Sequence, residues 1–169
     1  MDDTQRLLAY QQIRNLAAGY AVALDARDLD SLVALFVPDV RVGRNTVGRE
    51  ALRGDFERQL RAIGVSFLNV GSHWIELLDA DHARGVVYCK AELEDGARWI
   101  HQAIQYHDRY ERRAGHWYFV QRRHCLVYGQ EQSPSPLAQE KAQWPESSTG
   151  RGSVPWSLES WQRFWKREH

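Results

Sequence analysis

The sequence has few cysteines and no long hydrophobic run. Only Cys89 and Cys125 occur among the 169 residues, each within an apolar segment, where a free cysteine usually packs as a small hydrophobic residue. A disulfide framework is therefore not expected. No apolar run approaches the roughly 18 residues that suggest a membrane span, and the N-terminus lacks the basic and apolar regions of a signal peptide. We therefore expect a cytoplasmic protein that does not enter a membrane.

The charges of the chain cancel. Lys and Arg total 22, as do Asp and Glu, so no net field draws the protein to nucleic acid or to an anionic membrane. The histidines show no short two-histidine spacing with a nearby third ligand, and no Gly-rich phosphate loop, nucleophile elbow or Cys-His signature occurs. We expect a hydrophobic small molecule as the partner, and neither a metal nor a cofactor.

The first 64 residues have helical periodicity. Apolar side chains recur every three or four residues over 7–24, which predicts an amphipathic helix with Thr4 as a possible cap. Asp28 is placed to cap a short second helix, which Pro38 ends. A third apolar stripe ends at Gly64. Three helices are therefore predicted.

Beyond Gly64 the periodicity becomes that of strands. Polar or glycine-containing turns separate four apolar segments, at 65–78, 84–93, 98–112 and 116–128. Because these turns are short, the strands are expected to pair as an antiparallel meander, and the helices are available to cover one face of the sheet. The fold class is therefore α+β, with three N-terminal helices packed on a curved, mostly antiparallel sheet.

The last third of the chain differs in composition. From Gly129 to about Pro155, Gln, Ser, Pro and Gly dominate, and helical spacing of aromatic residues returns only near the C-terminus. We expect a core domain over 1–128 and an arm over 129–169 that ends in a short amphipathic helix. That helix packs either on its own chain or on a neighbouring subunit, or it covers a pocket as a lid.

Two motifs carry a resemblance to a known family. The segment Ala-Leu-Asp-Ala-Arg-Asp closes the first helix, and residues 106–117 read as an aromatic and acidic strand, a turn with glycine and a tryptophan that opens the last strand. Over about residues 5–128 the chain resembles the SnoaL-like branch of the nuclear transport factor two-like superfamily. The resemblance implies a cone-shaped α+β barrel and, together with the exposed sheet face and the Trp-rich tail, a homodimer or a homotrimer.

The resemblance also implies a catalytic set. Dehydratases and a dehydrochlorinase of this superfamily use an aspartate near the end of the first helix and a histidine on the first long strand, positions matched here by Asp25 and His73. His73 is then the general base, and Asp25 fixes its tautomer and stabilises the imidazolium. Tyr20, five residues before the aspartate as in the bile acid dehydratase, assists the leaving group or a developing oxyanion.

Further residues are candidates for binding the substrate. Strand alternation places His73 on one face with Phe67 and Asn69, and Phe36 is a further candidate for the apolar wall. His101 matches a second pocket histidine of scytalone dehydratase, although a polar-facing position is an open alternative. Arg122 and Arg123 point to opposite faces, so one of them enters the cone and pairs with Asp108, Asp25 or a ligand.

These observations predict a cofactor-independent lyase of the dehydratase type. The predicted substrate is a hydrophobic cyclic molecule such as a steroid or a polyketide, from which the enzyme removes a proton at carbon. Two alternatives stay open: an isomerase or cyclase that uses the same base, and a non-catalytic module for small-molecule binding or assembly.

Overall fold

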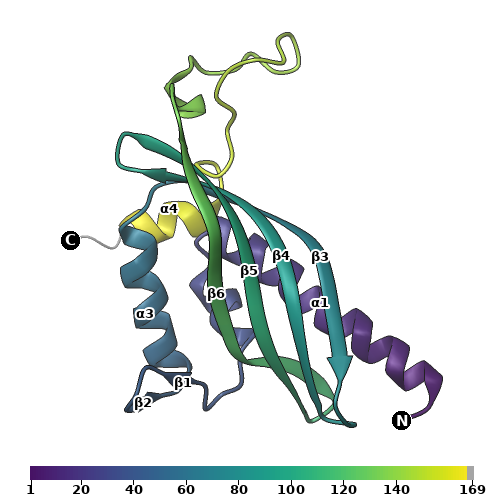
Figure 1. Ribbon diagram of the computed structural model, residues 1–169. Coiled ribbons are helices and arrows are strands. Elements are labelled where there is room, and N and C mark those ends of the chain that lie inside the picture. The colour runs from purple at the N-terminus through teal and green to yellow at the C-terminus, as the bar shows by residue number, and fades with distance from the viewer. Residues whose placement is uncertain (167–169) are drawn as a thin grey trace.

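The computed structural model describes residues 1–166, in which helices pack against one face of a four-stranded sheet (Figure 1). Helix α1 (Asp3–Asp25) begins at a capping box: the Asp2 carboxylate accepts from the Gln5 backbone N–H at 2.8 Å, and the Gln5 side chain accepts from the Asp2 N–H at 3.0 Å. Thr4 therefore lies inside the first turn and is not the cap. The inner side of α1 is buried from Ala9 to Leu24.

The chain then turns back along the sheet. Asp28 caps helix α2 (Leu29–Ala34) as predicted, because its carboxylate accepts from the Ser31 backbone N–H. After α2, Val37 donates its backbone N–H to the Phe119 carbonyl at 3.0 Å, which fixes this segment beside the edge strand of the sheet. A hairpin of β1 (Arg41–Val42) and β2 (Thr46–Val47) leads into α3 (Arg49–Arg61).

The sheet is an antiparallel meander in the order β3, β4, β5, β6. Its strands are β3 (Ser66–Leu77), β4 (His82–Asp95), β5 (Arg98–Arg113) and β6 (His116–Gln132). The predicted α+β class is confirmed, and the cone is formed by an open sheet and its covering helices. β6 continues past residue 128, and the division of the chain at that point stays a prediction.

A β-bulge in β3 decides which side chains face the core. Val70 pairs with Cys89 and His73 pairs with Val87, so two residues of β3 lie opposite Tyr88 alone. An extra residue reverses the inward and outward alternation. Leu68 and Val70 therefore share the inner face with His73, whereas Phe67 and Trp74 lie outside and are 59% and 56% exposed.

The C-terminal segment returns to the same chain. A 3-10 helix (Pro136–Ala138) interrupts the arm, and α4 (Glu159–Lys166) follows it. In α4, the Ser160 hydroxyl donates to the Ala26 carbonyl at 2.8 Å, and Trp161 packs with Val65 and Trp99. Three arrangements were predicted for this helix: on its own chain, on a neighbouring subunit, or as a lid. The structure shows it packed on its own chain.

No helix within residues 1–166 is both long and apolar enough to cross a membrane. The cytoplasmic location and the homodimer or homotrimer stay predictions.

Candidate active-site pocket

A pocket of about 300 Å³ lies between the helices and the inner face of the sheet. This volume is at the lower end of the range found for small-molecule sites. Its walls come from α1, α3, the segment around β1, β5 and β6, and consist of Tyr20, Phe36, Val40, Arg41, Leu52, Asp55, Phe56, Gln59, Tyr106, Val120, Gln121, Arg122 and His124. The lining combines aromatic and aliphatic side chains with six charged or polar ones, so it is about equally apolar and polar.

Arg122 is the buried cation of this pocket. Its Nε donates to Asp108 Oδ1 at 3.0 Å and its Nη2 donates to Asp108 Oδ2 at 2.9 Å, while both side chains are almost fully buried. Burial alone would lower the pKa of Arg122, but the Asp108 carboxylate outweighs this effect and raises it. The third nitrogen, Nη1, is buried and has no hydrogen-bond partner among the described residues. A buried donor of this kind carries a desolvation cost that a ligand oxygen would relieve.

Aromatic rings enclose the same guanidinium. Its central carbon lies 4.3 Å from the ring centre of Tyr106, 4.4 Å from that of Tyr20 and 4.5 Å from that of Phe119. Such cation-π contacts are stronger in a desolvated site. Together with the two bonds to Asp108, they hold Arg122 in one orientation, with Nη1 buried and without a hydrogen-bond partner among the described residues.

Asp108 also connects the pocket arginine to His73. The Tyr110 hydroxyl donates to Asp108 Oδ2 at 2.8 Å, and His73 Nε2 lies 3.0 Å from the same hydroxyl oxygen. Because the hydroxyl proton goes to Asp108, Nε2 is assigned as the donor to the Tyr110 oxygen. A Cβ at Gly85 would lie 3.3 Å from His73 Nε2 and from a Tyr110 ring carbon, so glycine leaves space for this contact across β4.

Burial lowers the pKa of His73 to about 4 from 6.5, although the nearby Asp108 charge opposes the change. The unfolded chain therefore binds a proton between pH 6.5 and 4 that the folded chain does not. His73 contributes to stability fully above pH 6.5, and that contribution is lost as the pH falls towards 4.

We predict that His73→Gln reduces the loss of stability between pH 6.5 and 4, because the titrating group is removed. Urea denaturation at several pH values measures this dependence. His116→Gln, which removes an exposed imidazole, is the control. In this variant the free energy of unfolding should depend on pH as it does in the wild type. If the free energy of unfolding falls equally between pH 6.5 and 4 in the wild type and in His73→Gln, the lowered pKa of His73 is contradicted.

Asp25 has partners other than His73. Its carboxylate accepts from the Ser66 hydroxyl and from the Leu68 backbone N–H, both at 2.8 Å. Burial raises the pKa of Asp25, and these two bonds oppose the rise. From Leu68 to His73 the strand covers about 15 Å, too far for contact. No hydrogen bond joins Asp25 to His73 in residues 1–166, so the expected pairing is corrected: Asp25 meets the start of β3, and His73 lies further along it.

Ser66 links Asp25 to a second buried arginine, Arg27, which is 2% exposed. The Arg27 Nη1 donates to the Ser66 hydroxyl at 2.9 Å and to the Leu24 carbonyl at 2.8 Å, and Nη2 donates to the Gly64 carbonyl. Burial lowers the pKa of Arg27 to about 10, while Asp25 opposes the change. The guanidinium also lies 4.9 Å from the Trp161 ring. Arg27 thus joins the end of α1, the start of β3 and α4.

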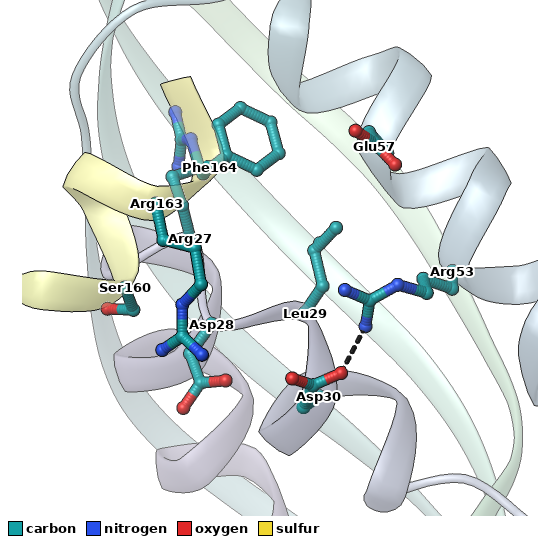
Figure 2. A pocket seen from close by; sticks show the side chains of 9 residues that line it. All are labelled: Arg27, Asp28, Leu29, Asp30, Arg53, Glu57, Ser160, Arg163 and Phe164. Atoms are coloured by element: carbon teal, nitrogen blue, oxygen red, sulfur yellow. Dashed lines mark hydrogen bonds and ion pairs between the residues drawn. The ribbon is translucent and has the colours of Figure 1, made fainter. Parts of the chain in front are cut away.

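Figure 2 shows a small hollow beside Arg27, with the Arg53 and Asp30 ion pair on its other side. Its volume is about 40 Å³, which suits one or two waters and not a cyclic ligand. Asp28, Leu29, Glu57, Ser160, Arg163 and Phe164 complete its lining. We therefore interpret the hollow as part of the packing of α4.

The structure brings three of the predicted site residues together and separates the others. Tyr20, Phe36 and Arg122 line the pocket. The remaining ones, Asp25, His73, His101, Phe67, Asn69 and Arg123, do not line it. Burial raises the pKa of Tyr20 to about 12, so its phenol keeps its proton at neutral pH.

The separation of the other residues has local causes. The bulge in β3 turns Phe67 and Asn69 outward, which corrects their expected position beside His73. His101 contacts the side chain of Gln132 near the end of the sheet. Arg123 lies on the outer face, where it lines an open groove with Trp74. Arg122 is therefore the inward arginine, and Asp108 is its partner, one of those anticipated.

Sequence reasoning missed several lining residues, among them His124, Tyr106 and Asp55. The signal for His124 was present, because it follows Arg122 by two residues on the same strand and so shares its face. Asp55 on α3 gave no signal, since its position depends on how the helix crosses the sheet.

The fold and the pocket define an α+β cone protein with an aromatic cavity and one buried arginine. The model of the SnoaL-like domain family matches residues 5–123, and the chain belongs to that family. A search of curated proteins gave no match.

Several solved structures share the fold. A hexachlorocyclohexane dehydrochlorinase of LinA type 3 from Novosphingobium barchaimii aligns with a TM-score of 0.71 and 20% identity, covering 79% of this chain and 97% of that one. A putative scytalone dehydratase from Novosphingobium aromaticivorans aligns at 0.67 and 18%, covering 78% and 92%. A Mycobacterium tuberculosis protein of unknown function aligns at 0.63 and 21%, covering 73% and 74%. At these identities the likeness establishes the fold alone.

Proposed function

We propose that the protein is a cofactor-independent lyase of the dehydratase type, acting on a hydrophobic cyclic molecule such as a steroid or a polyketide. The observation that carries the proposal is the buried guanidinium of Arg122, which lines the pocket beside Tyr20 and Tyr106 and whose Nη1 has no hydrogen-bond partner among the described residues. It suits a substrate that is apolar over most of its surface and carries one oxygen to be held.

The chemistry of elimination fits this donor. When a proton leaves the carbon beside a carbonyl group, negative charge develops on the carbonyl oxygen. Preoriented donors in a site shielded from water stabilise that charge more in the transition state than in the ground state. Arg122 supplies one such donor, and the protonated phenol of Tyr20 lines the same pocket.

The relatives support the reaction class. A dehydrochlorinase and a putative dehydratase, both named for eliminations, are among the proteins that share this fold. An isomerase or a cyclase would need the same stabilised oxyanion and would differ in where the proton returns.

A non-catalytic binding module is the second candidate. It is favoured by one observation: the aspartate and histidine expected to form the base pair have separate partners. Turnover separates the two candidates, because a binding module needs the donor of Arg122 but converts nothing.

We predict that Arg122→Lys weakens ligand binding at least tenfold, because lysine can pair with Asp108 but cannot also present a fixed donor to the pocket. Thermal stabilisation by steroid ketones and by hydroxylated tetralones measures binding, and product analysis measures turnover. Arg123→Lys, on the outer face of the same strand, is the matched control. Unchanged binding in Arg122→Lys would contradict the proposed anchor.

A further inference from the structure

We propose that His124 is the general base of this pocket, the group that removes the proton from substrate carbon. This inference rests on the proposed lyase function and deepens it. Nothing in the family resemblance assigns a role to this position. The resemblance pointed instead to His73, whose surroundings in the structure differ from those of a pocket base.

The position of His124 follows from the alternation of β6. Arg122 and His124 are two residues apart on a regularly paired stretch, in which Arg122 lies opposite Asp108 and His124 lies opposite Tyr106. Their side chains therefore share the inner face of the sheet. Both line the pocket, together with Tyr20. One ligand can thus meet the donor of Arg122 and the imidazole of His124 at the same time.

The imidazole of His124 is also available. No hydrogen bond of its ring to another of the described side chains occurs, and its ring stands at 78° to that of Tyr106, with the ring centres 5.7 Å apart. This edge contact orients the ring without occupying a nitrogen lone pair. His124 is exposed overall, and desolvation of its ring lowers its pKa, although a hydrogen bond of the ring to the His124 backbone opposes the change. The lone pair of the other ring nitrogen is able to accept a proton.

His73 does not meet these conditions. It does not line the pocket, and its Nε2 is occupied by the Tyr110 hydroxyl. Tyr110 and Asp108 lie between it and Arg122 in the hydrogen-bonded chain. We therefore assign His73 a structural role outside the pocket, where its ring packs beside Tyr110 at the crossing of β3, β4 and β5.

The proposed step balances without any co-reactant. A His124 nitrogen takes the proton from the carbon next to the carbonyl, and the electron pair of that bond passes to the carbonyl oxygen, held by Arg122 Nη1. The enolate then re-forms the carbonyl and expels the hydroxyl group from the β-carbon. The proton on His124 passes to the departing hydroxyl, so water and an unsaturated ketone leave and neutral His124 is restored.

The test compares His124→Gln with His73→Gln, each in the whole 169-residue chain. Exchange of the α-hydrogens of 1-tetralone in heavy water, followed by NMR, reports proton removal without elimination. Conversion of 3-hydroxy-1-tetralone to 1-naphthol and water reports the complete reaction. Thermal stabilisation by 1-tetralone reports binding and shows that each variant is folded.

We expect His124→Gln to lower both rates about a hundredfold or more, the range of general-base catalysis, and to keep ligand stabilisation. His73→Gln should keep both rates within a small factor. If His124→Gln exchanges and converts at rates close to those of the wild type, the assignment of His124 is overturned while the lyase function stands. The same conclusion follows if only His73→Gln loses both rates about a hundredfold. If the wild type binds 1-tetralone and neither exchanges nor converts, both the lyase function and this assignment fail.

Discussion

Replacing Arg27 with alanine is expected to lower the free energy of unfolding by about 3 kcal/mol, the scale of losing a buried charged group from its hydrogen-bond network. The change leaves the Leu24 and Gly64 carbonyls without their guanidinium donor and removes the cation that faces Asp25 through Ser66. The contact with Trp161 of α4 is lost as well. Urea denaturation followed by fluorescence measures the effect, since Trp161 reports on the same junction.

Two further variants make the Arg27 prediction specific. Arg163→Ala removes an exposed arginine that lines the same hollow and should change stability by no more than about 0.5 kcal/mol. Arg27 has a φ of 57°, a conformation that glycine adopts freely. Arg27→Gly should therefore lose less than Arg27→Ala, by up to about 1 kcal/mol. If Arg27→Ala proves as stable as Arg163→Ala, the network does not stabilise the fold as described.

The second large effect is expected at Asp108, where Asp108→Asn should cost roughly 3 kcal/mol. The substitution keeps the shape of the side chain but leaves the guanidinium of Arg122 buried without a counter-charge, which is the costly way to break an internal ion pair. Tyr110 also loses a charged acceptor. Thermal and urea denaturation measure the loss.

Glu76→Gln is the matched control for Asp108→Asn. It breaks the pair of Glu76 with Arg84, whose Nε and Oε2 atoms are 2.5 Å apart and whose side chains are 39% and 59% exposed. Exposed pairs contribute at most about 1 kcal/mol, so this variant should remain close to the wild type. A loss in Asp108→Asn no larger than in the control would show that Arg122 finds another partner or solvent.

The parts of the fold that repeat a pattern were predictable from sequence. The helices and the meander follow from apolar spacing and short turns, which are local properties. The predicted cap of α1 was wrong because two acceptable capping residues, Asp2 and Thr4, lie close together. Asp2 caps the helix because it forms a capping box with Gln5.

The candidate site depended on features that are not local. The bulge at Gly71 and Ser72 reverses the faces of β3, and a glycine within a strand was its only signal. The partner of Asp25 is set by where the end of α1 meets β3. The sequence did not distinguish Arg122 from Arg123. Only the register of β6 with β5 places Arg122 opposite Asp108 and makes it the buried ion-pair partner of that residue.

The arm between β6 and α4 is held at both of its ends. It leaves the sheet where Gln132 pairs with Trp99, and it returns to α4, whose Trp161 belongs to the same hydrophobic cluster as Trp99. Figure 1 shows the arm between β6 and α4. None of the residues that line the candidate pocket belongs to it. The entropy of closing a loop grows slowly, by about 0.6 kcal/mol for each doubling of its length. Leu137 and Trp156 of the arm pack against the cluster of Val65, Trp99 and Trp161. The exposed stretch between them is therefore a natural site for insertion or grafting of a binding sequence, with the chemistry of the cone left unaltered.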